Sequence, residues 1–112
     1  MKQTIKNIEQ WFYDRNLHTQ DPRIQLTKTI EELGELASAI NKNDRIEQID
    51  AIGDVTVTLI GIAIQLNLDY QTCVQVAYNE IKDRKGKLIN GVFVKEEDLI
   101  EEYELEDFKN EK

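Results

Sequence analysis

Hydrophobic positions recur at helical spacing along most of the chain. Between Thr4 and Asn16 apolar side chains return every three or four residues, which predicts a first helix. A second helix is expected from Pro22 to about residue 41, with Asp21 as its N-terminal cap. We expect one side of this helix to face the core, with Leu26, Ile30, Leu33, Leu36, Ala37 and Ile40.

Two further helices are expected after residue 43. From Asp44, which forms a capping box with Glu47, to about Asn67 the chain is apolar almost all round, as in the central helix of a bundle. A fourth helix begins after the cap Asp69. Its residues that we expect to face inward are Val74, Ala77 and Ile81.

The pattern changes after residue 85. The stretch "KLINGVFV" is β-prone, and Asn90-Gly91 at its centre predicts a short hairpin. The acidic segment that follows is consistent with a short helix, a tail, or an arm that orders on a neighbouring subunit. We therefore expect a single all-α domain over residues 1–112. A four-helix bundle would occupy about 1–85, with a β-prone or irregular appendage and an acidic tail over about 86–112.

Composition narrows the classes of partner. A formal charge of −8 and a pI of about 4.6 argue against nucleic acid and anionic membranes. Cys73 is the only cysteine, which excludes an internal disulfide, and we expect it to be buried. The most apolar stretch, Val55 to Leu68, is too short for a membrane span, and no signal-like start is present. We expect a cytoplasmic protein that buries additional surface as a homo-oligomer.

Three glutamates crowd into "EELGE" on the second predicted helix. Taken alone, such glutamates are typical of a solvated helix face. On a helical wheel, however, Glu31 points toward water, whereas its neighbours share the rim of the core. The polar residues along this rim are Gln25, Lys28, Glu32 and Glu35.

Asp54 lies inside the apolar third helix. It shares a polar arc with Glu47, Asp50 and Thr58. A charge in such a position must face solvent, a basic partner or a cation, because burying it unpaired is costly. If the arc meets the rim of the second helix, four carboxylates come together and one or two divalent ions would neutralise them. The predicted metal ligands are then Glu32, Glu35, Asp50 and Asp54.

The alternative to a metal site is that both arcs face water or form ion pairs with Lys28 and Lys82. A magnesium ion held by oxygen ligands alone would point to phosphate chemistry. Basic residues for such phosphates stand near the end of the fourth helix, at Lys82, Arg84 and Lys85, with Asn79 one turn earlier. By themselves these cations are also explained by a helix C-terminus that complements its dipole.

The motif "EELGE", followed by "DAIGD" at the start of an apolar helix, resembles the MazG-like superfamily of all-α nucleoside triphosphate pyrophosphohydrolases. The segment "NEIKDRKGKLINGVFVKEED" is similar to small MazG-like proteins of phages and bacteria, and the resemblance covers nearly the whole chain. It implies Mg²⁺-dependent hydrolysis of an NTP or dNTP to the monophosphate and pyrophosphate, with Mn²⁺ as a substitute ion. It also implies a homodimer or homotetramer.

The resemblance also implies roles for individual residues. Glu32, Glu35 and Asp54 would bind metal, and Glu31 would support a ligand or act as the base that activates water. The residues expected to contact substrate are Gln25, Lys28, Asn79, Lys82, Lys85 and Trp11, with Trp11 near the base. The superfamily has a glutamate where this chain has Ala51, and Asp50, an i,i+4 neighbour of Asp54, is the expected replacement.

Two other functions remain open from the sequence. One is a non-catalytic helical oligomer that binds nucleotides or a protein partner, which the residue Ala51 makes tenable. The other is a plain structural bundle. The spacing of Trp11 and Phe12 by itself favours a core or a subunit interface over a base-stacking platform.

Overall fold

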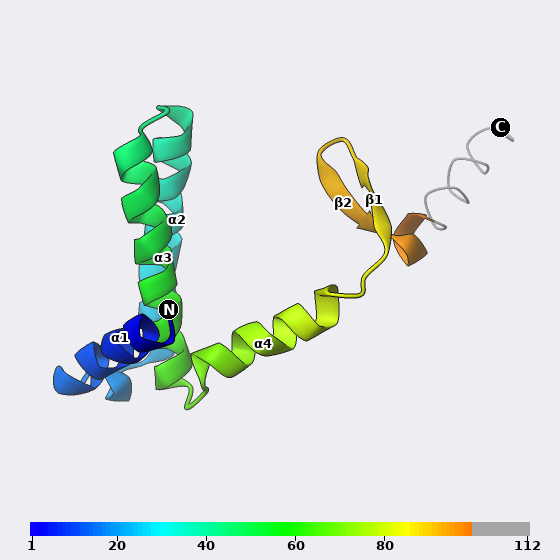
Figure 1. The fold of residues 1–112 in the computed structure, drawn as a ribbon. Coiled ribbons are helices and arrows are strands. Elements are labelled where there is room, and N and C mark those ends of the chain that lie inside the picture. Colours follow the sequence, from blue (N-terminus) through cyan, green and yellow to red (C-terminus); the bar gives the residue numbers. More distant parts are fainter. Residues whose placement is uncertain (100–112) are drawn as a thin grey trace, which may run out of the picture. The chain divides into compact units, whose positions relative to one another are not determined.

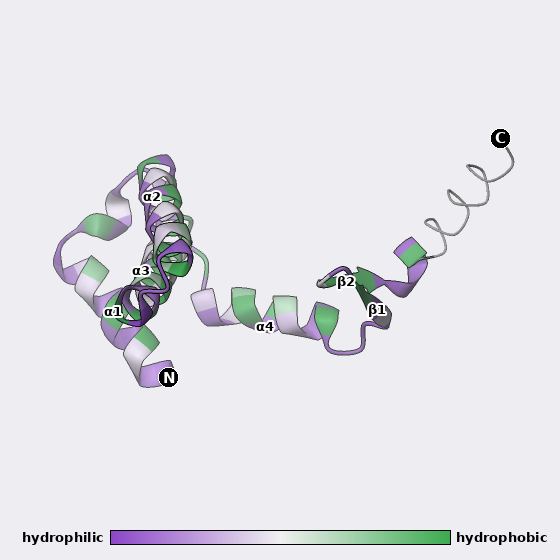
Figure 2. Ribbon diagram, turned by 90° about the horizontal axis from the view of Figure 1, so that it is seen from above, coloured by the Kyte–Doolittle hydropathy of each residue, from purple (hydrophilic) through white to green (hydrophobic). Residues whose placement is uncertain are grey.

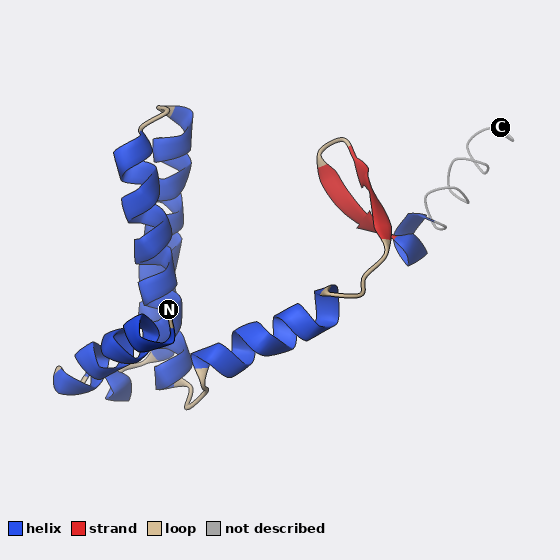
Figure 3. Cartoon of the chain, viewed as in Figure 1, coloured by secondary structure: helices blue, strands red, loops and turns tan. Residues whose placement is uncertain are grey.

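The computed structural model describes residues 1–99 and is mainly helical (Figures 1 and 3). The all-α fold class with four substantial helices and a small C-terminal sheet is confirmed. In chain order the elements are α1 (Lys2–Asp14), the 3₁₀ turn η1 (Leu17–Thr19), α2 (Pro22–Asn41), α3 (Arg45–Gln65), α4 (Tyr70–Ile81), β1 (Gly86–Ile89) and β2 (Val92–Lys95). The prediction for the acidic tail from residue 100 onward lies outside the described residues.

The chain forms two compact units. The first unit comprises Met1–Cys73, and the second begins at Val74 and is described up to residue 99. Across residues 1–99, no single helix is long and apolar enough to cross a membrane. The helices α3 and α4 meet that test of length and composition only when they are taken together as a bent pair.

The predicted helix starts are confirmed by side-chain caps. The carboxylate of Asp21 accepts a hydrogen bond from the backbone N–H of Arg23 at 2.9 Å, one residue after the proline that opens α2. At the start of α4, Asp69 accepts hydrogen bonds from the N–H of Thr72 at 3.0 Å and from its hydroxyl at 2.7 Å. Each cap satisfies N–H groups that have no partner inside the helix.

The cap of α3 differs in one detail from the predicted capping box. Asp44 accepts from the N–H of Glu47 at 3.1 Å, as expected. The N–H of Asp44 itself, however, donates to the carbonyl of Ala39 at 3.0 Å. The turn between α2 and α3 therefore satisfies the group that the Glu47 side chain would otherwise reach.

The core of the first unit is built where α1 crosses the C-terminal half of α3 (Figure 1). Phe12, Ile60 and Ile64 are 3%, 0% and 5% exposed. Gly61 allows this contact, because a Cβ there would lie 2.5 Å from the ring carbon Cζ of Phe12. The residues packed around this centre are Ile5, Ile8, Leu17, Val57 and Tyr70.

The prediction for the inward face of α2 is wrong for most of its residues. Four of them are between 48% and 62% exposed, namely Leu26, Ile30, Leu33 and Ile40. Ala37 is exposed as well, and Leu36 is half-buried. The buried residues of α2 are instead Thr29 and Ala39. Small side chains at these two positions allow α2 to approach α3 closely, so packing selects a less apolar face than the helical wheel does.

The residues of α4 that were expected to face inward are also exposed, contrary to prediction. No residue of α4 is buried, and Val74, Ala77 and Ile81 are all exposed within the described chain. Cys73, expected to be buried, is exposed as well. Figure 2 shows several apolar positions along this helix.

The second unit contains the predicted hairpin. Strands β1 and β2 are antiparallel, and Gly86 pairs with Lys95 while Ile89 pairs with Val92. Asn90 and Gly91 form the turn with φ values of 51° and 80°. Positive φ at both central residues is what a two-residue hairpin turn of type I′ requires, and this dipeptide adopts it readily.

Candidate active site

Three carboxylates from two helices come together in the first unit. Glu32 and Glu35 lie one turn apart on α2, and Asp54 lies on α3. One oxygen from each lies within 4.8 Å of the others. We call these three residues the carboxylate cluster. The contact between α2 and α3 produces it, as expected from the sequence.

The electrostatics of the cluster disfavour three free negative charges. Burial raises the pKa of Glu32, and the hydrogen bond with Glu35 and the charges of Glu35 and Asp54 raise it further. Burial also raises the pKa of Asp54, together with the charges of Asp50 and Glu35. The oxygen Oε2 of Glu32 is buried and has no hydrogen-bond partner among the described residues.

The nearby ammonium group does not neutralise the cluster. Lys28 pairs with Glu31, its Nζ atom 3.5 Å from Oε2. The other ion pair of residues 1–99 joins Arg23 to Asp21. The cluster therefore has no basic partner within 4 Å there. An unpartnered buried oxygen beside two further carboxylates, with no nitrogen or sulfur donor, fits a hard divalent cation.

Two other predicted residues lie beside the cluster and not within it. Asp50 is close enough to Asp54 to raise its pKa, but it does not belong to the group of oxygens within 4.8 Å. Glu31 is exposed and is held by Lys28. Ala51 is buried, and as an alanine it offers no carboxylate at the position where the MazG-like pattern has one.

A polar cavity of about 290 Å³ adjoins the cluster on the side of the α2–α3 turn. It is lined by Glu35, Ser38, Lys42, Glu47, Asp50 and Ala51. Sequence reasoning did not single out Ser38 or Lys42. Their spacing from Glu35, three and then four residues along one helix, is the signal that places all three on one face.

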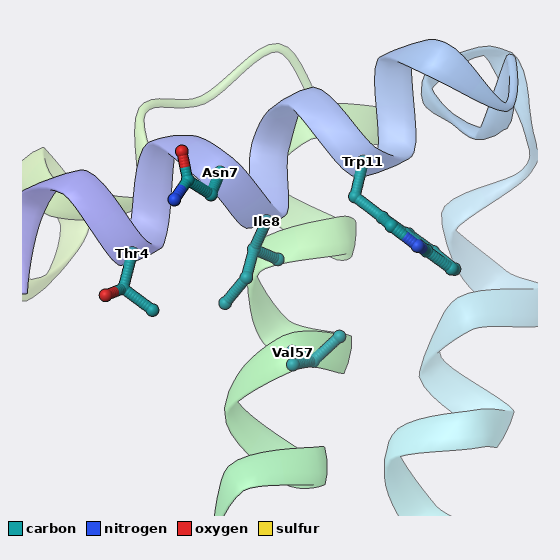
Figure 4. Close-up of a pocket in the computed structure, with 5 residues that line it drawn as sticks. All are labelled: Thr4, Asn7, Ile8, Trp11 and Val57. Carbon is teal, nitrogen blue, oxygen red and sulfur yellow. The ribbon is translucent and has the colours of Figure 1, made fainter.

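An apolar cavity of about 310 Å³, the α1–α3 cavity, is lined by residues of α1 and α3 (Figure 4). Its lining residues are Thr4, Asn7, Ile8, Trp11 and Val57. Val57 follows Asp54 by three residues on α3, so cavity and cluster occupy neighbouring turns of one helix. The guanidinium carbon of Arg15 lies 4.2 Å from the ring centroid of Trp11.

Thr4 and Asn7 were missed by sequence reasoning. With Trp11 they repeat at intervals of three and four residues, which places them on one face of α1. The side chain of Gln25 on α2 is half-buried near Gly61, and the backbone carbonyl of Gln25 accepts a hydrogen bond from the hydroxyl of Thr29. It packs between helices, whereas Lys28 is exposed.

The remaining predicted substrate residues belong to the second unit. Asn79 is exposed, and its Oδ1 accepts from Nε2 of Gln75 at 2.9 Å. Lys82 is exposed too. Lys85 lines a separate polar cavity of about 230 Å³, together with Arg84, Lys95, Glu96 and Glu97. That these residues act with the carboxylate cluster stays a prediction.

Most of the chain matches a known protein family. The helical fold and the carboxylate cluster are accompanied by a match of residues 1–84 to the family model of phosphoribosyl-ATP pyrophosphohydrolase. The class is therefore that of the nucleotide pyrophosphohydrolases, which hydrolyse acid anhydrides. This chain belongs to the phosphoribosyl-ATP pyrophosphohydrolase family. The family is related to the MazG-like proteins, and the narrower likeness to small phage MazG-like proteins stays a prediction.

A relative in Haemophilus phage HP1 (strain HP1c1) is an uncharacterized 18.2 kDa protein in the rep-hol intergenic region. It is 44% identical over 70 residues, which are 62% of this chain and 43% of that protein. The match thus spans less than half of the length of the relative. No solved structure matches the chain.

Proposed function

We propose that the protein is a Mg²⁺-dependent pyrophosphohydrolase that converts a nucleoside triphosphate, ribo or deoxy, to the monophosphate and pyrophosphate. The observation that carries this proposal is the carboxylate cluster: three carboxylate oxygens within 4.8 Å, without a basic partner in the described residues. Membership of a pyrophosphohydrolase family supports hydrolysis of an acid anhydride. Oxygen-only ligands favour Mg²⁺, with Mn²⁺ as a substitute.

Glu32, Glu35 and Asp54 are the residues that would hold the ion, with Asp50 beside them. When bound, the ion supplies charge neutralisation and polarises phosphate oxygens. Glu31 lies on the same turn of α2 but outside the carboxylate cluster. In our proposal its carboxylate accepts a proton from the water that attacks the α-phosphorus, and the bond to the bridging oxygen breaks to release pyrophosphate.

The substrate would extend from the cluster in two directions. The α1–α3 cavity, with the ring of Trp11 in its lining, suits the base, because an apolar cavity with few polar groups is typical of such sites. We assign phosphate contacts to Lys28, next to Glu31, and to Gln25 one turn before it. We assign the same role to Asn79, Lys82 and Lys85 of the second unit.

A homo-oligomer, dimer or tetramer, is the second part of the proposal. The half of the α2–α3 hairpin nearest its turn carries exposed apolar residues, with Ile46 and Ile49 81% and 66% exposed. Gly34 and Gly53, in the same half, would have nothing within 4 Å of an added Cβ. Glycine inside a helix costs about 1 kcal/mol relative to alanine, and close approach of a second copy would explain its use at both positions.

The test is a panel of NTPs and dNTPs with Mg²⁺ or Mn²⁺, in which monophosphate and pyrophosphate are both measured. We expect the two products in equal amounts from at least one nucleotide, and loss of turnover in the variant Glu35→Gln. Glu9→Gln, the same change on α1 outside the cluster and the α1–α3 cavity, is the matched control. The absence of turnover with every nucleotide would overturn the proposal.

One observation favours a second candidate, a non-catalytic nucleotide-binding oligomer. Ala51 leaves the site without a carboxylate at a position where the MazG-like pattern has one. Calorimetric titration separates the two functions. Binding of nucleotide with Mg²⁺ at micromolar concentrations, without product after prolonged incubation, would favour the binding protein.

A further inference from the structure

Trp11 is the one aromatic residue in the lining of the α1–α3 cavity. Its indole ring projects from α1 on the same side as Thr4 and Ile8 (Figure 4) and is 45% exposed. The buried ring of Phe12 meets it in an edge-to-face arrangement, with the ring centroids 5.3 Å apart and the planes at 76°. The indole is therefore in contact with the core at the mouth of an apolar cavity.

The guanidinium group of Arg15 covers one face of this ring. Its carbon lies 4.2 Å from the ring centroid, which is a cation–π contact. Nη1 of the same group donates to the backbone carbonyl of Trp11 at 3.1 Å. That carbonyl needs a partner because α1 ends here and the backbone N–H of Arg15 donates to Phe12 instead. Two contacts with one residue thus fix the guanidinium over the indole.

The face that Arg15 covers is not the face that the cavity uses. Arg15 is not among the lining residues, although its guanidinium is in contact with the ring. No carboxylate within 4 Å competes for Arg15 in residues 1–99, since both ion pairs there join other residues. A planar base that enters the cavity can therefore stack only on the opposite, open face of the indole.

We propose that Arg15 is a positioning residue for the base of the substrate, because it holds the indole of Trp11 so that the open face receives the base. The inference rests on the proposed function in taking the substrate to be a nucleotide whose base enters the α1–α3 cavity. An indole on a helix surface has several rotamers, and fixing one of them before binding removes part of the ordering cost of binding. A cation–π contact at an exposed site corresponds to about a 2- to 5-fold effect on affinity.

The single tryptophan of the chain allows a direct test, because all tryptophan fluorescence comes from Trp11. The probes are the α,β-methylene analogues of the common nucleoside triphosphates with Mg²⁺, which cannot release pyrophosphate. We expect saturable quenching by at least one analogue, since a base stacked on the indole quenches its emission. Inorganic triphosphate with Mg²⁺ has no base and should leave the emission unchanged.

Three variants test the role of the guanidinium. Arg15→Gln should raise the dissociation constant of the analogue and the KM of the substrate by about 2- to 5-fold, with kcat unchanged. Arg15→Lys keeps the charge without the planar fork and should recover only part of the affinity. Lys6→Gln removes the same charge from α1 outside the cavity lining and should leave both constants unaltered.

A spectroscopic signature separates positioning from a general effect of charge. In the protein without nucleotide, Arg15→Gln should increase the quenching of Trp11 by acrylamide, because the second face of the ring becomes accessible. The melting temperature should stay within about two degrees of the wild type, as for most exposed substitutions. Lys6→Gln should change neither quantity.

The outcomes also separate this inference from the proposed function. Turnover without quenching, a dissociation constant that Arg15→Gln leaves unaltered, or full recovery by Arg15→Lys would overturn the inference while the hydrolase stands. Quenching that depends on Arg15, without hydrolysis of any natural nucleotide, would support the inference and remove the hydrolase. Neither quenching nor turnover with any nucleotide would overturn both.

Discussion

Both halves of α3 carry three isoleucines, but the surroundings of these isoleucines differ. In the C-terminal half, Ile60 and Ile64 are buried under Phe12 of α1, and Gly61 is required by the contact. In the N-terminal half, Ile46, Ile49 and Ile52 are exposed, and Gly53 has open space beside it. The C-terminal half of α3 is thus covered by α1, whereas the isoleucines of its N-terminal half are exposed.

The acidic residues of α3 lie in its N-terminal half. Asp50 and Asp54 lie there, and Asp54 has a raised pKa that packing within the chain does not relieve. The C-terminal half therefore stabilises the fold, whereas the N-terminal half carries the surfaces to which our proposal assigns the cation and a second copy. The predictions below test this division, in order of decreasing effect.

The largest effect on stability is expected from the core that α1 forms with the C-terminal half of α3. Phe12→Ala should lower the free energy of unfolding by about 3–5 kcal/mol, because it empties the centre of the core. Urea denaturation at matched protein concentration measures this change. Tyr13→Ala, which removes an exposed aromatic ring from the next position, is the control, and a similar loss from both variants would contradict the division.

Asp54→Asn should reduce turnover by about 100-fold or more, equivalent to about 2.7 kcal/mol, since it removes a ligand of the proposed ion. It should not lower the stability of the metal-free protein, because it also removes repulsion from Asp50 and Glu35. We expect Mg²⁺ to raise the melting temperature of the wild-type protein, and this rise should disappear in the variant. Asp14→Asn on α1 should retain both turnover and that rise.

Ile49→Asp should weaken self-association by at least about tenfold, or 1.4 kcal/mol, because it places a charge on the exposed apolar half of α3. Sedimentation velocity over a concentration series measures the effect. Gln20→Asp introduces the same charge elsewhere and should have no effect. A monomeric wild-type protein would show that the exposed isoleucines serve another purpose.

The smallest effect is a dependence on pH. The pKa values of Glu32 and Asp54 are raised on folding, so the folded state binds more protons in the range between the unfolded and folded pKa values. Protonation of these groups therefore stabilises the metal-free protein at low pH, and this stability is lost as pH rises through the folded pKa values. Glu32→Gln should flatten the curve of melting temperature against pH. A curve that Glu32→Gln leaves unchanged would contradict a raised pKa of Glu32 in the folded state.

Much of the fold follows from local sequence. The caps Asp21, Asp44 and Asp69 predict where three helices begin, and Asn90-Gly91 predicts the hairpin, because these residues satisfy nearby backbone groups or favour a particular φ. The meeting of "EELGE" with Asp54 was predictable because a carboxylate inside an apolar helix must face solvent, a basic partner or a cation. Which apolar face of α2 packs inward was not predictable in this way.

The reason is that hydrophobicity does not say which partner covers a face. Leu33 and Ile40 are as apolar as core residues, yet α3 packs against Thr29 and Ala39, where small side chains permit close approach. The α1–α3 cavity was missed for a similar reason. It depends on the crossing of two helices, and the polar spacing on α1 gives only half of its lining.

The most direct measurement is hydrolysis of the best nucleotide substrate with Mg²⁺ in ¹⁸O-labelled water, followed by mass spectrometry of both products. Attack at the α-phosphorus predicts one labelled oxygen in the monophosphate and none in pyrophosphate. Glu35→Gln should give neither product. Label in pyrophosphate, release of inorganic phosphate instead, or no cleavage at all would contradict the proposed hydrolysis.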